Sequence, residues 1–267
     1  MYQPHKRNFA GALVFSTVAM MAATSAQAEL VASWSFNNTL AADQAGVSAL
    51  TAIDPLGASG FITDTVNGVD QQVYRFAGGQ SAAQQGGLAV STAGLITGNT
   101  YSVDIVFQFE SNQTTWESIF GVSNRTKDGA FYVNPANYLQ VYPVSSGVTP
   151  FTFGEYHQVT LTNQGDGTVS AYLDGVLQLT ATTDVLDFST YATQNPEQLI
   201  HFFLDDAGEY ANGRVARIGI FDTALSASEI GNLSYGNVPG VPEPETWAML
   251  LAGLGVMGAT ARRRARV

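Results

Sequence analysis

The chain of 267 residues contains no cysteine, and positive charge is scarce. Without cysteine, disulfide bonds, thiol nucleophiles and thiolate metal ligands are excluded. Six of the 11 Lys and Arg residues lie near the two ends, so residues 29–240 hold five basic and 20 acidic side chains, a net charge of −15. This acidity repels phosphate backbones, and we expect no nucleic-acid partner. It favours solubility and the binding of divalent cations.

Long apolar runs lie near the two ends. At the beginning, Lys6 and Arg7 precede an apolar stretch over residues 9–23, and Ala26 and Ala28 follow in the small-x-small arrangement that a signal peptidase reads. The stretch is shorter than the roughly 20 residues of a membrane span. We therefore predict a signal peptide over residues 1–28, with an N-terminal membrane anchor as the alternative.

The other end has three consecutive parts. Pro242, Glu243 and Pro244 are followed by a glycine-containing apolar stretch over residues 246–261, and then by four arginines within residues 262–266. An apolar segment with arginines at its end is oriented with those arginines in the cytoplasm. We therefore predict a short transmembrane helix over residues 246–261.

This three-part layout resembles the PEP-CTERM sorting signal, over residues 239–267. The resemblance implies recognition by an exosortase-type membrane enzyme, and removal or transfer of the tail. It also implies a Gram-negative bacterium, often one that makes exopolysaccharide or biofilm. We expect an exported protein of the cell envelope, cell surface or extracellular matrix that is held only transiently in the inner membrane.

Between the two ends, short alternating or apolar segments separated by Gly, Asn, Asp and Pro predict antiparallel strands. Asp174-Gly175 predicts a type I′ hairpin turn, because both residues tolerate positive φ. Ser226 and Glu229 form a capping box that predicts one short helix over 226–233. Residues 41–70 and 77–99 are expected to be long loops with short strands. The predicted fold is all-β, a two-sheet antiparallel jelly-roll sandwich over residues 29–238. The predicted strands are 30–36, 72–76, 101–109, 118–122, 130–133, 138–142, 157–162, 168–173, 199–204 and 215–221.

Three stretches, 30–40, 168–177 and 213–230, resemble the laminin-G-like, concanavalin A-like jelly roll. They correspond to its opening W-x-F strand, its Y-x-D-G hairpin, and its closing strand with the following short helix. The resemblance implies a lectin- or glucanase-type sandwich. Ala216-Arg217 stands where that family carries an acidic pair, so no calcium contact at that position can be transferred to this chain.

The sequence shows no catalytic constellation. Retaining glycoside hydrolysis needs two carboxylates about 5 Å apart, whereas Asp104 and Glu110 would lie about 20 Å apart along one strand. Asp104 is expected on a solvent or groove face. His157 and His201 have no acidic or serine partner in a recognisable motif, and G-x-S-x-G, H-E-x-x-H and phosphate-loop motifs are absent. We expect a protein that is not an enzyme.

Two groups of residues are candidate binding sites. Asp205, Asp206 and Glu209 lie within five residues in a Gly-containing loop, which suits Ca²⁺ because calcium prefers oxygen ligands; a solvated acidic loop is the alternative. Aromatic and amide side chains suit carbohydrate, unless these aromatic rings fill the core; Trp34, Phe107 and Phe203 are expected to do so. The carbohydrate candidates are Trp116, Tyr132, Asn134, Asn137 and Tyr138, with Trp116 expected to be the most exposed.

The sequence therefore predicts an exported domain that binds extracellular polysaccharide or surface glycans, in adhesion or in an exopolysaccharide matrix. Ca²⁺ is the one candidate cofactor, and no other is expected. A divergent polysaccharide-active hydrolase or lyase on the same fold is the first alternative. A structural matrix protein without a discrete ligand is the second.

Overall fold

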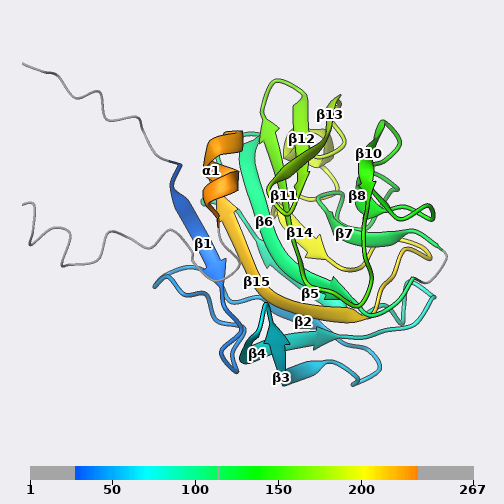
Figure 1. The fold of residues 1–267 in the computed structure, drawn as a ribbon. Helices are drawn as coiled ribbons and strands as arrows, with labels where there is room; N and C mark the ends of the chain where they lie inside the picture. Colours follow the sequence, from blue (N-terminus) through cyan, green and yellow to red (C-terminus); the bar gives the residue numbers. More distant parts are fainter. Residues whose placement is uncertain (1–27, 113–114, 234–267) are drawn as a thin grey trace, which may run out of the picture.

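The computed structural model describes residues 28–112 and 115–233, which form two antiparallel β-sheets packed face to face (Figure 1). This architecture confirms the predicted two-sheet sandwich. Residues 1–27 of the predicted signal peptide, Ala26 included, and the sorting segment with Pro242, Glu243 and Pro244 lie outside the described residues, whereas Ala28 is described. Within 28–112 and 115–233, no helix has the length and apolar character needed to cross a membrane.

The first sheet contains eight strands, and both the first and the last strand of the described chain belong to it. β15 is central, because β6 pairs with one of its edges while β4 and β1 pair with different parts of the other. The order across the sheet is β13 (Val176–Thr182), β12 (Thr168–Leu173), β11 (His157–Gln164), β6 (Thr100–Phe109), β15 (Gly213–Phe221), β4 (Val69–Phe76) and β3 (Gly60–Val66), with β1 (Leu30–Trp34) beside β15.

The second sheet contains seven strands and packs against the first. Its order is β10 (Ser145–Pro150), β9 (Tyr138–Val141), β8 (Ala130–Val133), β7 (Glu117–Gly121), β14 (Leu199–Phe202), β5 (Gly87–Ser91) and β2 (Thr51–Ile53). Two short helical elements complete the described part, the 3-10 turn η1 (Phe188–Tyr191) and the helix α1 (Ala227–Asn232).

A single large apolar core fills the space between the sheets. Alternate residues of most strands point into it, as a period of two along a strand requires. Trp34, Phe107 and Phe203 are each at most 1% exposed, which confirms their predicted place in the core. The Phe203 ring stacks on Phe76 with centroids 3.9 Å apart. Side chains that point away from this core therefore form the outer faces of the sandwich.

Local geometry confirms two predicted elements. Asp174 and Gly175 both have positive φ, 50° and 79°, and turn the chain from β12 into β13. At α1, the Ser226 hydroxyl accepts a hydrogen bond from the backbone N–H of Glu229, and the Glu229 carboxylate accepts one from the N–H of Ser226. This reciprocal pair satisfies two backbone donors that the helix start leaves unpaired.

The prediction for Asp104 is wrong. Its side chain points outward from β6, yet it is only 1% exposed and pairs with Arg217 Nη2 at 2.5 Å. Gln158 and Thr160 also donate to its carboxylate, each at 2.7 Å. Arg217 reaches Asp104 from an irregularity in the β15–β6 register between Val215 and Arg217, and bulges of this kind re-aim side chains. The basic residue that departs from the family pattern therefore neutralises a buried carboxylate on the neighbouring strand.

Candidate functional site

Three aromatic rings form a cluster on the outer side of the second sheet. Tyr132 lies in β8 between Phe131 and Val133, which point into the core, so its own side chain points away from the core. Trp116 precedes β7 and packs edge-on against Tyr132, with centroids 5.6 Å apart. Tyr142 follows β9 and packs against Trp116 with centroids 5.1 Å apart. Trp116 is half-buried rather than fully exposed.

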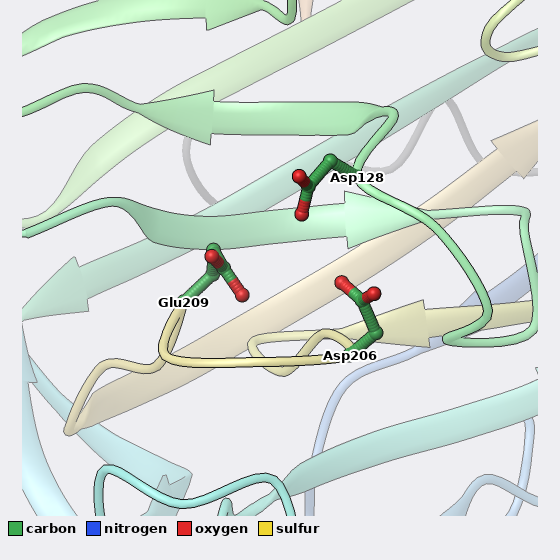
Figure 2. A group of neighbouring side chains, drawn as sticks. All are labelled: Asp128, Asp206 and Glu209. Atoms are coloured by element: carbon green, nitrogen blue, oxygen red, sulfur yellow. The ribbon is translucent and has the colours of Figure 1, made fainter.

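Two loops bring three carboxylates to the same place. Asp128 lies in the β7–β8 loop, and Asp206 and Glu209 lie in the β14–β15 loop. One carboxylate oxygen from each lies within 4.8 Å of the others. Figure 2 shows the three carboxyl groups turned toward a common space. Together with the aromatic cluster, Asp128 and Glu209 line one cavity of about 70 Å³.

The proximity of these carboxylates affects their ionisation. Burial, followed by the negative charge of Asp128, raises the pKa of Asp206. Oδ1 of Asp206 is buried and has no hydrogen-bond partner in the part of the chain that the structure describes. A cation between the carboxylates would offset their repulsion and give this oxygen a partner.

Asp205 lies beneath this group instead of within it. It is 2% exposed, and its Oδ2 accepts a hydrogen bond from the Tyr132 hydroxyl. Its Oδ1 accepts one from the N–H of Asp206 at 2.9 Å. Burial, reinforced by the negative charges of Asp206 and Glu209, raises the pKa of Asp205 to about 7. Asp205 thus fixes the position of Tyr132 and of the acidic loop.

A buried polar layer supports the two loops from below. Arg125 Nε donates to the Asp205 carbonyl at 3.0 Å, and Arg125 Nη2 donates to the Ala82 carbonyl at 2.7 Å. Gln85 Oε1 accepts from the N–H of Asp205 at 2.8 Å. These contacts connect the β7–β8 loop to the β14–β15 loop, so the cavity wall is held by specific hydrogen bonds. Burial lowers the pKa of Arg125, while Asp205 and Asp206 oppose this shift.

The remaining predicted carbohydrate residues lie at the turn between β8 and β9. Asn134 Oδ1 accepts from the N–H groups of Ala136 and Tyr138, at 2.9 and 3.0 Å. Asn137 has φ 70° and accepts a side-chain hydrogen bond from Asn112. The side-chain oxygen of Asn134 therefore stabilises the turn. These residues do not line the cavity at Trp116.

The structure joins residues that the sequence placed in two separate sites. Trp116 and Tyr132, predicted for carbohydrate, share one cavity with Glu209, predicted for calcium, and Asp206 is beside it. Sequence reasoning missed Asp128. Its one local sign is the Asp128-Gly129 pair before a strand, which is also an ordinary turn pattern.

The arrangement offers two kinds of interaction. Carboxylate oxygens are the ligands that hard divalent cations such as Ca²⁺ prefer, so the residues present fit such an ion. Aromatic rings beside them provide apolar contact for a sugar ring. The cavity is small against the roughly 300–1,000 Å³ of pockets that enclose a small molecule. It suits an ion, or one edge of a ligand that otherwise rests on the surface.

The chain belongs to the concanavalin A-like lectin/glucanase superfamily, whose laminin-G-type family model matches residues 67–231. Residues 240–264 match the PEP-CTERM protein-sorting motif, which indicates an exported protein associated with the cell envelope. Both matches confirm the resemblances seen in the sequence. None of the curated proteins matches the chain.

Solved structures share this fold at low sequence identity. One is domain 4 of AbnA, an extracellular arabinanase of Geobacillus stearothermophilus, in complex with arabinotriose. It has a TM-score of 0.56 and 18% identity, over 77% of this chain and 98% of that one. Another is the binding domain of botulinum neurotoxin serotype D/C, with a TM-score of 0.51 and 17% identity, over 78% of this chain and 53% of that one. These similarities show the fold alone.

Proposed function

We propose that the chain is a non-enzymatic, exported carbohydrate-binding protein that acts in adhesion or in an extracellular polysaccharide matrix. The observation that carries the proposal is the cavity where Trp116, Tyr132 and Tyr142 adjoin Asp128 and Glu209. Aromatic faces and edges pack against the C–H groups of sugars, while carboxylates accept hydrogen bonds from hydroxyls. The arabinotriose bound by the arabinanase domain supports a saccharide ligand on this fold.

Calcium is the proposed cofactor. Asp128, Asp206 and Glu209 would hold it, with Asp205 acting beneath them to position Tyr132 and the loop. The net negative charge of the surrounding domain supports cation binding. A cation beside Trp116 would draw the two loops together and present a charged centre to sugar hydroxyls.

The sorting motif supports a location for this binding activity at the cell envelope or outside the cell. An exosortase-type enzyme would process the C-terminal segment, after transient retention in the inner membrane of a Gram-negative bacterium. The binding domain would then reach the cell surface or the extracellular matrix. There its partner would be an extracellular polysaccharide or a surface glycan.

Polysaccharide hydrolysis is the second candidate function, and one observation favours it. The carboxylate oxygens lie within 4.8 Å of one another, close to the separation of about 5 Å used in retaining hydrolases. The cavity of about 70 Å³ supports binding over hydrolysis, because hydrolysis needs room for sugar units on both sides of the broken bond.

A glycan array with calcium, followed by a reducing-sugar assay, tests this proposal. We expect the purified protein to bind a set of neutral glycans, and Trp116→Ala to lose that binding. Val176→Ala is a control because Val176 is exposed and does not line the cavity. Reducing ends released from a bound polysaccharide would establish the hydrolase instead. No binding to any glycan would favour a structural matrix protein.

A further inference from the structure

A second cavity opens on the outer face of the other sheet, and its volume is about 510 Å³. Gln108 in β6 lies between Phe107 and Phe109, which point into the core, so its side chain points outward. Its partner across the strands is Arg214 in β15. Asp64 from β3 and the segment Gly154–Tyr156 before β11 complete the wall. Figure 1 shows β3, β6 and β15 in the sheet that carries this face.

The polar groups of this cavity are fixed by one another. Arg214 Nη1 donates to Asp64 Oδ2 and to Gln108 Oε1, both at 3.0 Å. The Tyr156 hydroxyl donates to the same Asp64 oxygen at 2.9 Å. Because Arg214 is a pure donor, it also determines which end of the Gln108 amide is the oxygen.

The side-chain amide of Gln108 is the feature of this cavity that indicates a ligand. The residue is only 7% exposed and lines the cavity, and its oxygen is held by Arg214. Within residues 28–112 and 115–233, the side-chain hydrogen bond of Gln108 is the one from Arg214, so its amide nitrogen is left to face the cavity. A donor that faces a cavity without a protein partner can bind a ligand that brings an acceptor.

Charge and size narrow the class of ligand. Asp64 and Glu110 pair with the guanidinium groups of Arg214 and Arg75, and Glu155 lines the same cavity. Both guanidinium groups are paired with carboxylates, although Arg214 Nε is buried without a hydrogen-bond partner in the described residues, and the exposed Glu155 adds a negative charge to the wall. The wall therefore disfavours an anionic ligand. Donors and acceptors lie side by side, which suits hydroxyl groups because each both donates and accepts. The volume is in the range of about 300–1,000 Å³ of ordinary ligand pockets.

We propose that this cavity is a second binding site, for a neutral saccharide, on the face opposite to the Trp116 cavity. Gln108 Nε2 donates to a sugar oxygen, Glu155 and Asp64 accept from hydroxyls, and the Tyr156 ring contacts the sugar. Where both sites are used, one domain holds two polysaccharide segments and cross-links them. Only this cross-linking rests on the proposed function of the Trp116 cavity; the second site stands without it.

Amide NMR titration of the purified ¹⁵N-labelled protein tests the site, with gluco-, xylo-, manno- and arabino-oligosaccharides as probes. We expect saturable shifts at Gly154, at Tyr156 and at Thr65, which also lines the cavity, with at least one neutral probe. Loss of one hydrogen bond in Glu155→Ala or Gln108→Met should weaken this binding by about tenfold or more. Trp116→Ala should leave these shifts unchanged. Oligogalacturonate, an anionic probe, should bind more weakly than the neutral probes.

Three results would overturn the second site. These are no shift at these residues with any neutral probe, equal or stronger binding of oligogalacturonate, or undiminished shifts in both Glu155→Ala and Gln108→Met. Failure of the Trp116 cavity gives a different result, in which the shifts near Glu155 remain and those near Trp116 are absent. Spectra of each variant without sugar show whether its fold is intact.

Discussion

At the residue scale, Asp104 and Arg217 form a buried ion pair in the first sheet. Their side chains are 2% and 7% exposed, so each charge depends on the other. A buried charge that loses its partner is strongly destabilising, because it has left water without compensation. A carboxylate at position 217 would face Asp104 without a counter-charge, so Arg217 suits this position where the resembled family carries an acidic residue.

We predict that Asp104→Asn or Arg217→Met alone lowers the free energy of unfolding by about 3–5 kcal/mol. The double variant should lose clearly less than the sum of the two, since no unpaired charge remains. Urea denaturation of the four proteins measures this. Additive losses would show that the two residues act independently.

His201 should make stability depend on pH. It is 7% exposed in β14, and burial, followed by the positive charge of Arg125, lowers its pKa to about 4. In the unfolded chain, the His201 imidazole takes up a proton as the pH falls through about 6.5. In the folded chain, it does so only near pH 4. The resulting stability is complete above about pH 6.5 and is lost as the pH falls toward 4.

We expect the stability lost between pH 7 and pH 4.5 to be smaller in His201→Gln than in the natural chain, by up to about 3 kcal/mol. Urea denaturation across this pH range measures the difference. Identical pH profiles for the two proteins would contradict a buried neutral imidazole at this position.

At the scale of elements, the start of β15 depends on a close approach that only glycine permits. A Cβ at Gly213 would lie 2.2 Å from the Gln108 carbonyl oxygen and 2.6 Å from the Phe76 ring. The strand therefore packs against β6 and β4 with no room for a side chain. Overpacking of this kind typically costs about 1–3 kcal/mol.

Gly213→Ala should lower the melting temperature by several degrees, about 3–8 °C for a domain of this size. Gly60→Ala is the matched control, because a Cβ there would meet nothing within 4 Å. That variant should be neutral or slightly stabilising. Equal effects of the two substitutions in calorimetry would show that steric contact at Gly213 is not the cause.

Strand existence could be predicted where the pattern of apolar residues is strong. β8 and β12 begin and end where the sequence predicts, because their buried residues are strongly apolar. β10 was missed, since Ser145–Pro150 is mostly exposed and is a strand only because β9 offers it an edge. β3 falls within residues 41–70, where long loops with short strands are predicted, and its seven residues pair with β4 along their whole length.

The candidate site was predictable only in parts. The acidic loop and Trp116 each carry a local pattern, but their meeting depends on how the β7–β8 and β14–β15 loops pack. Asp128 lies 78 residues from Asp206 in the chain, so no local pattern links them. Asp104 was misplaced for the same reason, because its counter-charge comes from a different strand.

At the scale of the whole molecule, the sandwich presents a cavity on each of its two outer faces. The acidic cavity at Trp116 is the proposed place for calcium. A ligand that binds only the folded chain stabilises it, by about 2.7 kcal/mol at a hundred times its dissociation constant. The effect must disappear when the carboxylates are removed.

We predict that saturating Ca²⁺ raises the melting temperature by about 5 °C or more. The increase should vanish in Asp128→Asn and in Glu209→Gln and persist in Glu197→Gln, an exposed carboxylate outside the group. Differential scanning fluorimetry with and without a chelator measures it. No Ca²⁺-dependent shift in the natural chain would exclude the proposed cofactor.

Affinity electrophoresis through gels that contain neutral polysaccharides tests the central claim most directly, namely that the Trp116 cavity binds carbohydrate. The natural protein should be retarded by at least one polysaccharide in the presence of Ca²⁺, and Trp116→Ala should be retarded clearly less in the same gel. Equal mobility of the two proteins in every gel would contradict the claim.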